Sequence, residues 1–402
     1  MTEPRPRPRR TGPAATAKPA TAKPPTAKPP ATKPSATKPP ATKPNAASKP
    51  RPAVKPTQPR AAAKAAASAK ATPPGPRRIW ISGATGFVGE AIVRVLRTRG
   101  DAVVAPVRDA RKAQDLIDMG VTVIEDDLSD VAGIADQLRD VDAAIHAAGS
   151  YRVGITREER GAMWDANIGT TTRVLDAAEV AHTPRLVYIS TVNVFGNTHA
   201  QAVDESYRRN VREGFLSWYD ETKFGAHEVA AQRARAGAPI VSVLPSQVYG
   251  PGDHSEIGSQ IHLARAGRLP YRVLTGVGIG FVHVDDLAAG IVAALDRGTV
   301  PGTYILSGPR HRLGEALKIA ARLGGVSLPR LSLPDAAVRL AAPLGGLIGQ
   351  PNLREVVSAS AGVTYWASAD KAARELGFTT RSLEDGLRDT FEAEVEAAYT
   401  RS

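Results

Sequence analysis

A tyrosine and a lysine placed four residues apart offer proton-transfer chemistry. Tyr219 and Lys223 stand in the segment WYDETKF, and on a helix this spacing puts both side chains on one face. A free phenol has a pKa of about 10, which is too high for ready proton transfer near neutrality. Because a nearby ammonium favours the phenolate, we expect Lys223 to lower the pKa of Tyr219. Tyr219 would then exchange a proton with a carbonyl or an alcohol.

A threonine hydroxyl can complete this group. The apolar run 185–190 predicts a strand, and Thr191 follows its last residue. Open α/β sheets hold their ligands at the carboxyl ends of strands. There the Thr191 hydroxyl can hydrogen-bond the substrate oxygen and stabilise the charge that develops on it. The alternative role of this hydroxyl is to cap a turn or a helix.

A glycine-rich turn follows an earlier apolar run. The run RRIWIS leads into GATGFVG (83–89) and then into the helical pattern EAIVRVLRTRG. Glycines let the backbone approach a pyrophosphate, and a helix N-terminus presents free N–H groups to it. The spacing is G-x-x-G-x-x-G rather than G-x-G-x-x-G, but the strand before and the helix after supply the required context. We expect a dinucleotide to contact Gly83, Thr85, Gly86, Phe87, Val88 and Gly89.

The end of the second predicted strand indicates which dinucleotide is bound. An acidic residue there would pair with the ribose 2′-OH of NAD and repel a 2′-phosphate. This chain has Val107 followed by Arg108, whose guanidinium can fork onto a phosphate. We therefore predict NADP, with NAD as the alternative if Arg108 is a solvated side chain beside the adenine. Asp127 and Leu128, after the third strand, are placed to contact that adenine.

The elements that must position these residues alternate between strand and helix patterns. Such alternation is typical of βαβ units and a parallel sheet. We predict an α/β fold in which residues 77–250 form a Rossmann-type doubly wound parallel sheet. Residues 251–402 form mainly a smaller substrate-binding cap that returns segments to the sheet. The apolar, Gly-rich segment 335–350 is expected to be a buried cap helix, with contact to a membrane or a partner as the alternative. The predicted strands are 78–82, 102–107, 121–125, 143–146, 185–190 and 240–244.

The first 76 residues are predicted to be a disordered tail. Residues 1–78 hold 18 of the 52 Lys and Arg, 20 of the 32 Pro and a single acid, Glu3. Proline removes backbone donors, and the segment has too few large apolar side chains to offset its ordering entropy. The tail is either a spacer or a tether that binds a polyanion. The rest of the chain has 34 basic and 39 acidic residues, so the excess positive charge gives no support to nucleic-acid binding by the folded part.

Composition also excludes some classes of site. The chain has no cysteine, so disulfides and thiolate metal sites are ruled out, and we predict no metal. No run of 18 uncharged apolar residues occurs, so a membrane-spanning helix is not expected. Arg9-Arg10 is not followed by the apolar region of an export signal. We expect a cytoplasmic protein.

Nine ordered motifs between residues 78 and 391 resemble those of the extended short-chain dehydrogenase/reductases, the NAD-dependent epimerase/dehydratase group. Dihydroflavonol-reductase-like and hopanoid-associated sugar-epimerase-like members look nearest. The resemblance implies an NAD(P)-dependent oxidoreductase or epimerase, and homodimers are common in the group. The motifs are GATGFVG (83–89), DAAIHAAG (142–149), NIGTT (167–171), VYISTVNVFG (187–196), VDES (203–206), YDETK (219–223), LPSQVYGPGD (244–253), FVHVDDLAAG (281–290) and SADKAARELGF (368–378).

The resemblance also implies roles for single residues. Thr191, Tyr219 and Lys223 would be catalytic, and Asn167 would support the site from its helix. Tyr219 and Lys223 would also contact the cofactor, the lysine through the nicotinamide ribose. Further cofactor contacts would be Ala147, Ala148, Pro245 and Val248.

The residues after Thr191 narrow the reaction. Sugar dehydratases of the group carry Asp-Glu there for water elimination, whereas this chain has Val192 and Asn193. That leaves hydride transfer to a small-molecule carbonyl or from an alcohol, or epimerisation through a transient ketone. A third alternative is a non-catalytic NADP-binding module tethered by its tail. The segment 150–152 should face the substrate. Arg152 can hold an anionic group there, or it is a surface arginine.

Overall fold

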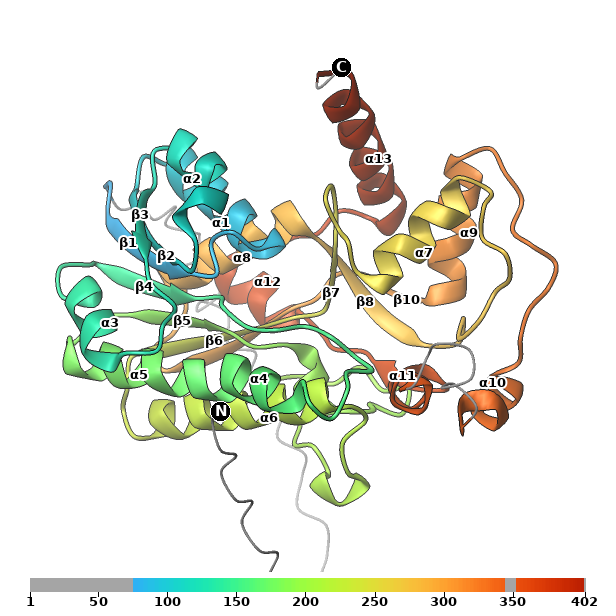
Figure 1. Ribbon diagram of the computed structural model, residues 1–402, viewed down its shortest axis with the longest axis horizontal. Helices are drawn as coiled ribbons and strands as arrows, with labels where there is room; N and C mark the ends of the chain where they lie inside the picture. Colours follow the sequence, from blue (N-terminus) through green and yellow to red (C-terminus); the bar gives the residue numbers. More distant parts are fainter. Residues whose placement is uncertain (1–74, 344–351, 401–402) are drawn as a thin grey trace, which may run out of the picture. The chain divides into compact units, whose positions relative to one another are not determined.

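Seven parallel strands form the central sheet, in the order β3-β2-β1-β4-β5-β6-β9 (Figure 1). This computed structural model describes residues 75–343 and 352–400. Strands β1, β4 and β6 are almost wholly buried apolar runs, as expected where both faces of a sheet are covered. The strands are β1 (Arg78–Ser82), β2 (Ala102–Val107), β3 (Thr122–Glu125), β4 (Ala143–His146), β5 (Leu186–Ile189), β6 (Ile240–Pro245) and β9 (Gly302–Leu306).

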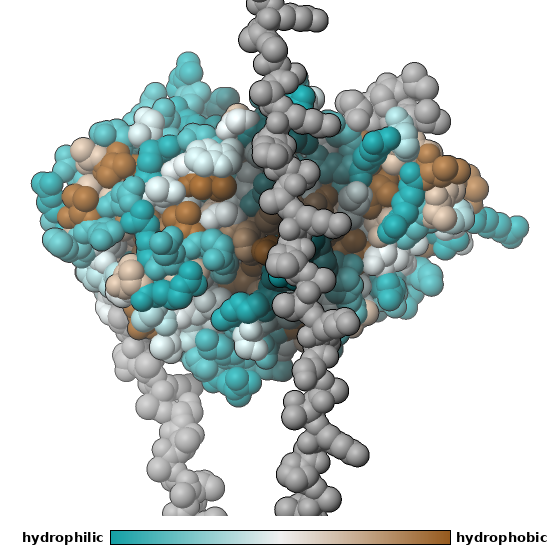
Figure 2. Space-filling view, turned by 90° about the horizontal axis from the view of Figure 1, so that it is seen from below, coloured by the Kyte–Doolittle hydropathy of each residue, from teal (hydrophilic) through white to brown (hydrophobic). Residues whose placement is uncertain are grey.

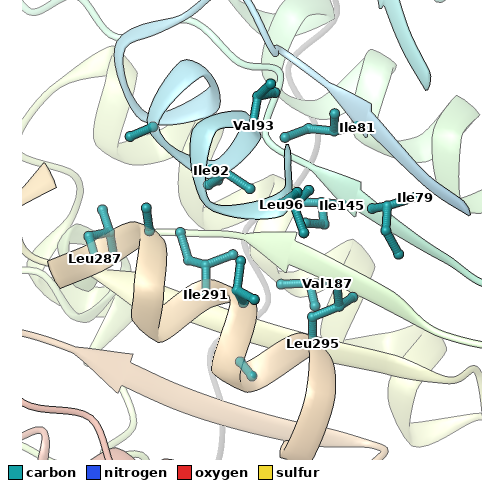
Figure 3. Packing of buried hydrophobic residues seen from close by; sticks show 14 of the residues in the cluster. Ile79, Ile81, Ile92, Val93, Leu96, Ile145, Val187, Leu287, Ile291 and Leu295 are labelled. Carbon is teal, nitrogen blue, oxygen red and sulfur yellow. The ribbon is translucent and has the colours of Figure 1, made fainter. Parts of the chain in front are cut away.

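Helices cover both faces of this sheet. Ile79 and Ile81 of β1 belong to the core cluster that packs against α1 and α8 (Figure 3). Trp80 belongs to the cluster on the other face, with α3, α5 and α6, because successive side chains of a strand point to opposite faces. The first face has α1 (Phe87–Thr98), α8 (Val284–Arg297) and α12 (Asp370–Leu376), and the second has α3 (Val131–Leu138), α5 (Thr170–Val180) and α6 (Trp218–Arg235). Short α2 (Gln114–Asp118) follows β2, and α4 (Arg160–Trp164) precedes a π-helical turn (Asp165–Gly169).

A second, smaller sheet forms the cap. Its central strand is β8 (Gly278–His283), which pairs in parallel with β7 (Gln247–Tyr249) and β11 (Thr364–Tyr365) and antiparallel with β10 (Arg310–Arg312). Apolar side chains of β8 form a core with helices α7, α9 and α13. After β8 the chain returns through α8 to β9, which pairs with β6. The cap helices are α7 (Glu256–Arg265), α9 (Leu313–Leu323), α10 (Asp335–Ala341), α11 (Leu353–Ser360) and α13 (Leu383–Thr400).

The doubly wound parallel sheet predicted from the sequence is confirmed. All six predicted strands are present, and their ends differ from prediction by no more than one residue. The prediction of a buried helix over 335–350 is wrong for its described part, because α10 has no buried residue and Leu340 is 82% exposed. The predicted disordered tail lies outside the described residues, apart from Gly75 and Pro76.

Among the residues that the structure describes, no helix is both long and apolar enough to span a membrane. On the face drawn in Figure 2, hydrophobic residues are interspersed among hydrophilic ones. Large exposed hydrophobic side chains occur on several elements, for example Ile117 of α2, Val180 of α5, and Val395 and Tyr399 of α13. Single exposed apolar residues are ordinary in a folded protein.

Candidate active site

The carboxyl ends of the parallel strands bring the predicted site residues to one edge of the large sheet. Gly83 follows β1, Arg108 follows β2 and Ala147 follows β4. Thr191 lies two positions after β5, and Pro245 ends β6. Open α/β sheets bind their ligands at this edge. The topology therefore gathers residues that are far apart in the sequence.

The turn after β1 has room for backbone only. Gly83 has a φ of +73°, and a Cβ atom on it would lie 2.7 Å from the backbone nitrogen of Ala148. A Cβ atom on Gly89 would lie 2.0 Å from the carbonyl oxygen of Gly83. Helix α1 starts directly after this turn, and its N-cap, Gly86, has no side chain to occupy the free N–H groups. This is a cradle that suits a pyrophosphate. The other predicted contacts in the turn are exposed or half-buried: Thr85, Gly86, Phe87 and Val88.

Three functional groups converge at the end of β5. Tyr219 and Lys223 lie in the first two turns of α6, and both are at least nine-tenths buried. The Thr191 hydroxyl lies beside the Tyr219 phenol. It also accepts from the Asn193 N–H at 3.3 Å and caps the short helical turn after β5, which is the alternative role expected for it. The Lys223 ammonium donates to the carbonyl oxygen of Ile189, the last residue of β5, at 3.2 Å. The threonine, the phenol and the ammonium therefore lie close together at the carboxyl edge of the large sheet, the same edge that carries the glycine turn.

The charge state of the phenol differs from the expectation. Burial raises the pKa of Tyr219 above that of a free phenol, and the neighbouring Thr191 hydroxyl offsets this only in part. Burial also lowers the pKa of Lys223 to about 8. The prediction that Lys223 lowers the pKa of Tyr219 is wrong here, because burial dominates and the ammonium hydrogen-bonds the end of β5. Tyr219 therefore keeps its proton near neutrality, which suits a proton donor.

Asn167 sits in the π-helical turn between α4 and α5. Its amide donates to the Ser150 carbonyl at 3.1 Å and to the Thr222 hydroxyl at 3.0 Å, and its oxygen accepts from the Ser150 N–H at 2.8 Å. It is 2% exposed. Asn167 thus connects the loop after β4 to Thr222 of α6, the residue directly before Lys223. Single π-helical turns often occur at functional sites, and here the turn aims a buried amide between two site elements.

The residues predicted to select the cofactor lie at the ends of β2 and β3. Arg108 is exposed, and the described ranges give it no ion-pair partner, whereas Arg111 pairs with Asp109 at 2.9 Å. Asp127 is exposed, and Leu128 is buried with a φ of +64°. The guanidinium of Arg108 is therefore available to a ligand. The predicted nicotinamide contacts lie at the end of β6 and in β7: Pro245, buried, and Val248, half-buried.

Beside the phenol stands an aromatic ring whose role the sequence did not indicate. Tyr151 meets the Tyr219 ring edge to face, with ring centroids 4.8 Å apart, and is 51% exposed. Ile155, from the same loop, packs against Tyr219. Segment 150–152 is expected to face the substrate, with Arg152 as either an anion ligand or a surface arginine. Arg152 is 64% exposed and pairs with Glu159 at 2.8 Å, as a surface arginine does. Tyr151, rather than Arg152, is the member of this segment that lies against the phenol.

A buried polar network beneath the site was also missed. Ser82 Oγ lies 2.7 Å from His146 Nδ1, and His146 Nε2 lies 3.1 Å from the Thr171 hydroxyl. Burial, with the nearby Lys223 charge, lowers the pKa of His146 to about 3, so the ring is neutral. Ser82 also accepts from the N–H of Ala148 at 3.3 Å, and its carbonyl accepts from the Ala147 N–H at 3.2 Å. The network therefore fixes both alanines predicted to line the cofactor.

A doubly wound sheet with a glycine cradle and a Tyr-Lys pair at its carboxyl edge defines a Rossmann-type dinucleotide enzyme. The NAD dependent epimerase/dehydratase family model matches residues 79–307, and the chain belongs to this family. The protein is thus an NAD(P)-dependent oxidoreductase or epimerase, as its sequence motifs predicted.

Three relatives place the chain within the family. It is 29% identical over 323 residues to a protein of Synechocystis sp. named for dihydroflavonol 4-reductase activity, which covers 77% of this chain and 92% of the relative. It is 28% identical to the 2-alkyl-3-oxoalkanoate reductase of Stenotrophomonas maltophilia, over 77% of this chain and 97% of the relative. The crystal structure of gox2253 superposes with a TM-score of 0.69 at 28% identity, covering 80% of this chain and 98% of that one.

Proposed function

We propose that the protein is an NADP-dependent reductase that converts a carbonyl into an alcohol, or catalyses the reverse oxidation, with Tyr219 as the proton donor or acceptor. The observation that carries this proposal is the convergence of Thr191, Tyr219 and Lys223 at the end of β5. A neutral phenol at this edge is already in the state that reduction needs. Epimerisation through a transient ketone is the alternative use of the same groups.

The residues present fit a dinucleotide. The glycine cradle, which a Cβ atom on Gly83 or Gly89 would fill, leaves backbone N–H groups for a pyrophosphate. Arg108 would hold a 2′-phosphate, Asp127 and Leu128 would flank the adenine, and Lys223 would bind the nicotinamide ribose. When bound, the dinucleotide supplies the hydride for reduction and takes it up in oxidation. The remaining contacts would come from Thr85, Gly86, Phe87, Val88, Ala147, Ala148, Pro245 and Val248.

Side chains of the protein complete the reaction. As the carbonyl carbon gains a hydride, its oxygen gains negative charge, and Tyr219 delivers its proton to that oxygen. The Thr191 hydroxyl donates a hydrogen bond to the same oxygen and stabilises the charge as it develops. Asn167 holds the loop after β4 against α6 and so keeps the phenol and ammonium in place. Val192 and Asn193, which follow Thr191, offer no acid-base pair for water elimination.

Consumption of cofactor distinguishes the two reactions. A reductase oxidises one NADPH for each alcohol formed, whereas an epimerase returns the hydride and leaves the cofactor unchanged. The experiment follows NADPH absorbance together with product formation across a panel of aromatic ketones, alkyl ketones and nucleotide sugars. Stoichiometric oxidation with at least one carbonyl is the expected result. Product formation from a nucleotide sugar without net NADPH loss would replace the proposal with epimerisation.

The surroundings of Tyr219 favour a carbonyl compound with an aromatic or alkyl portion. Tyr151 and Ile155 place a ring and a branched apolar side chain beside the phenol. Arg152 is engaged by Glu159 and gives no free cation for a phosphate in this loop. The names of two relatives, for dihydroflavonol and 2-alkyl-3-oxoalkanoate reduction, agree with such substrates.

Tyr151→Ala is expected to raise KM for an aromatic carbonyl about tenfold, because an aromatic contact is worth about 1 kcal/mol and its buried area adds to this. The turnover number should change much less, since the proton donor stays in place. Steady-state kinetics on the best carbonyl of the panel measure both constants. Tyr151→Phe is the matched control, because it keeps the ring, and it should retain the wild-type KM. A tenfold rise in KM for the phenylalanine variant would mean that the hydroxyl, not the ring, acts on the substrate.

Arg108→Ala is expected to lower kcat/KM for NADPH about 10- to 100-fold and to leave that for NADH nearly unchanged. A charge-assisted guanidinium–phosphate contact is worth about 1.5–3 kcal/mol and is lost with the side chain. Arg111→Ala removes a cation three residues further along the chain that is already paired with Asp109, so it should alter either constant less than twofold. Equal losses for NADPH and NADH in the Arg108 variant would contradict a role in binding the 2′-phosphate.

A further inference from the structure

An open hollow in the cap is lined by cations. It lies between the C-terminal half of α9 and residues 325–330, and its volume is about 580 Å³. Of the described residues that line it, four are Arg or Lys and none is Asp or Glu: Arg272, Lys318, Arg322 and Arg330. In Figure 1, α9 lies on the outer side of the cap, away from the seven-stranded sheet that carries the proposed active site. Since the chain beyond the tail has more acids than bases, this grouping departs from the rest of the folded part.

Most of these positive charges lack compensation from the protein. Lys318 and Arg322 are four residues apart on one face of α9, where like charges destabilise a helix. Arg322 pairs with Glu384 of α13 at 2.5 Å. Within residues 75–343 and 352–400, Lys318 and Arg330 have no ion-pair partner, and the buried Nε of Arg272 has no hydrogen-bond partner. An anion in the hollow would compensate the exposed charges of Lys318 and Arg330 and relieve the repulsion between Lys318 and Arg322.

The backbone holds these cations in position. The N–H of Arg272 donates to Leu331 at 3.0 Å, and its carbonyl accepts from Leu333 at 2.8 Å. This pairing keeps the chain that carries Arg330 beside Arg272. Guanidinium forks and an ammonium together match the several oxygens of a phosphate. We propose that the hollow binds a multiply charged phosphate group, carried either by a soluble phosphate compound or by the headgroup of an anionic lipid.

The test compares two double variants of the full chain with the wild type. Lys318→Gln with Arg330→Gln removes two exposed cations of the hollow, and Arg139→Gln with Arg212→Gln removes two exposed cations elsewhere as a charge-matched control. Calorimetry measures the affinity for pyrophosphate with NADP⁺ in excess, so that the glycine cradle is filled. We expect at least tenfold weaker binding for the hollow variant and less than a twofold change for the control.

A second arm identifies the source of the phosphate. Sedimentation with vesicles of equal parts phosphatidylcholine and phosphatidylglycerol measures binding to a headgroup, again for both double variants. Weaker pyrophosphate binding alone in the hollow variant points to a soluble phosphate compound, and weaker vesicle binding points to a headgroup. Either result supports the hollow as a phosphate site. Unchanged binding in both arms, or an equal loss in the control variant, would overturn the proposal.

Discussion

Tyr219→Phe should lower kcat for carbonyl reduction about 1000-fold while leaving the affinity for NADPH close to that of the wild type. A positioned proton donor contributes about 10²- to 10⁴-fold to a rate, and about 1000-fold corresponds to about 4 kcal/mol of activation free energy. The ring itself remains, so its contacts with Tyr151 and Ile155 persist. Steady-state turnover and cofactor titration of the purified variant measure the two quantities separately.

Tyr188→Phe provides the matched comparison. Tyr188 is a second buried tyrosine, on β5, and its ring centroid lies 5.6 Å from the Lys223 ammonium. Its hydroxyl is buried in the interior and is not one of the three groups at the end of β5, so its removal should change kcat by less than about threefold. If the Tyr219 variant kept more than a tenth of wild-type turnover, Tyr219 could not be the group that transfers the proton.

The strands and the cofactor turn were predictable because their signals are local. Buried strands of a parallel sheet are continuous apolar runs, and RRIWIS and IVSVLP show this within six residues. The spacing of the turn's glycines is equally local, and Gly89 meets backbone atoms of the same turn, whereas Gly83 meets the backbone of Ala148 after β4. Sequence spacing of four residues likewise placed Tyr219 and Lys223 on one buried face of α6.

The environment of the phenol was not predictable, because distant segments supply it. Residues from the segment 151–163 pack against the Tyr219 ring. The sequence around Tyr219 contains no pattern that predicts these contacts. Because burial is the largest effect, the pKa of Tyr219 is raised, whereas Lys223 was expected to lower it. The network beneath the site did leave a signal in the sequence. Ser82 and His146 are polar residues at the ends of otherwise apolar strands, where a buried polar group needs a partner.

The start of α6 depends on another distant residue. The Asp220 carboxylate pairs with Arg209, at 2.7 Å from one guanidinium nitrogen, and the side chains are only 2% and 5% exposed. The same carboxylate accepts from the N–H of Leu216 at 2.9 Å. Arg209 also lies over the Phe215 ring at 4.5 Å. This buried ion pair holds the chain before α6 against the helix, one residue from Tyr219.

Arg209→Met should lower the free energy of unfolding by about 3–5 kcal/mol, because it leaves the Asp220 charge buried without a partner. Methionine keeps an apolar contact with Phe215, so the loss reports mainly the charge. Adding Asp220→Asn removes that stranded charge and keeps an oxygen for the Leu216 N–H. The double variant should therefore be at least about 2 kcal/mol more stable than Arg209→Met alone, as expected when a buried pair is removed as a unit.

Urea unfolding of the wild type, both single variants and the double variant gives the coupling energy. A double variant no more stable than Arg209→Met would show that the guanidinium acts here through packing, and that the stability of the helix bearing Tyr219 does not depend on the ion pair.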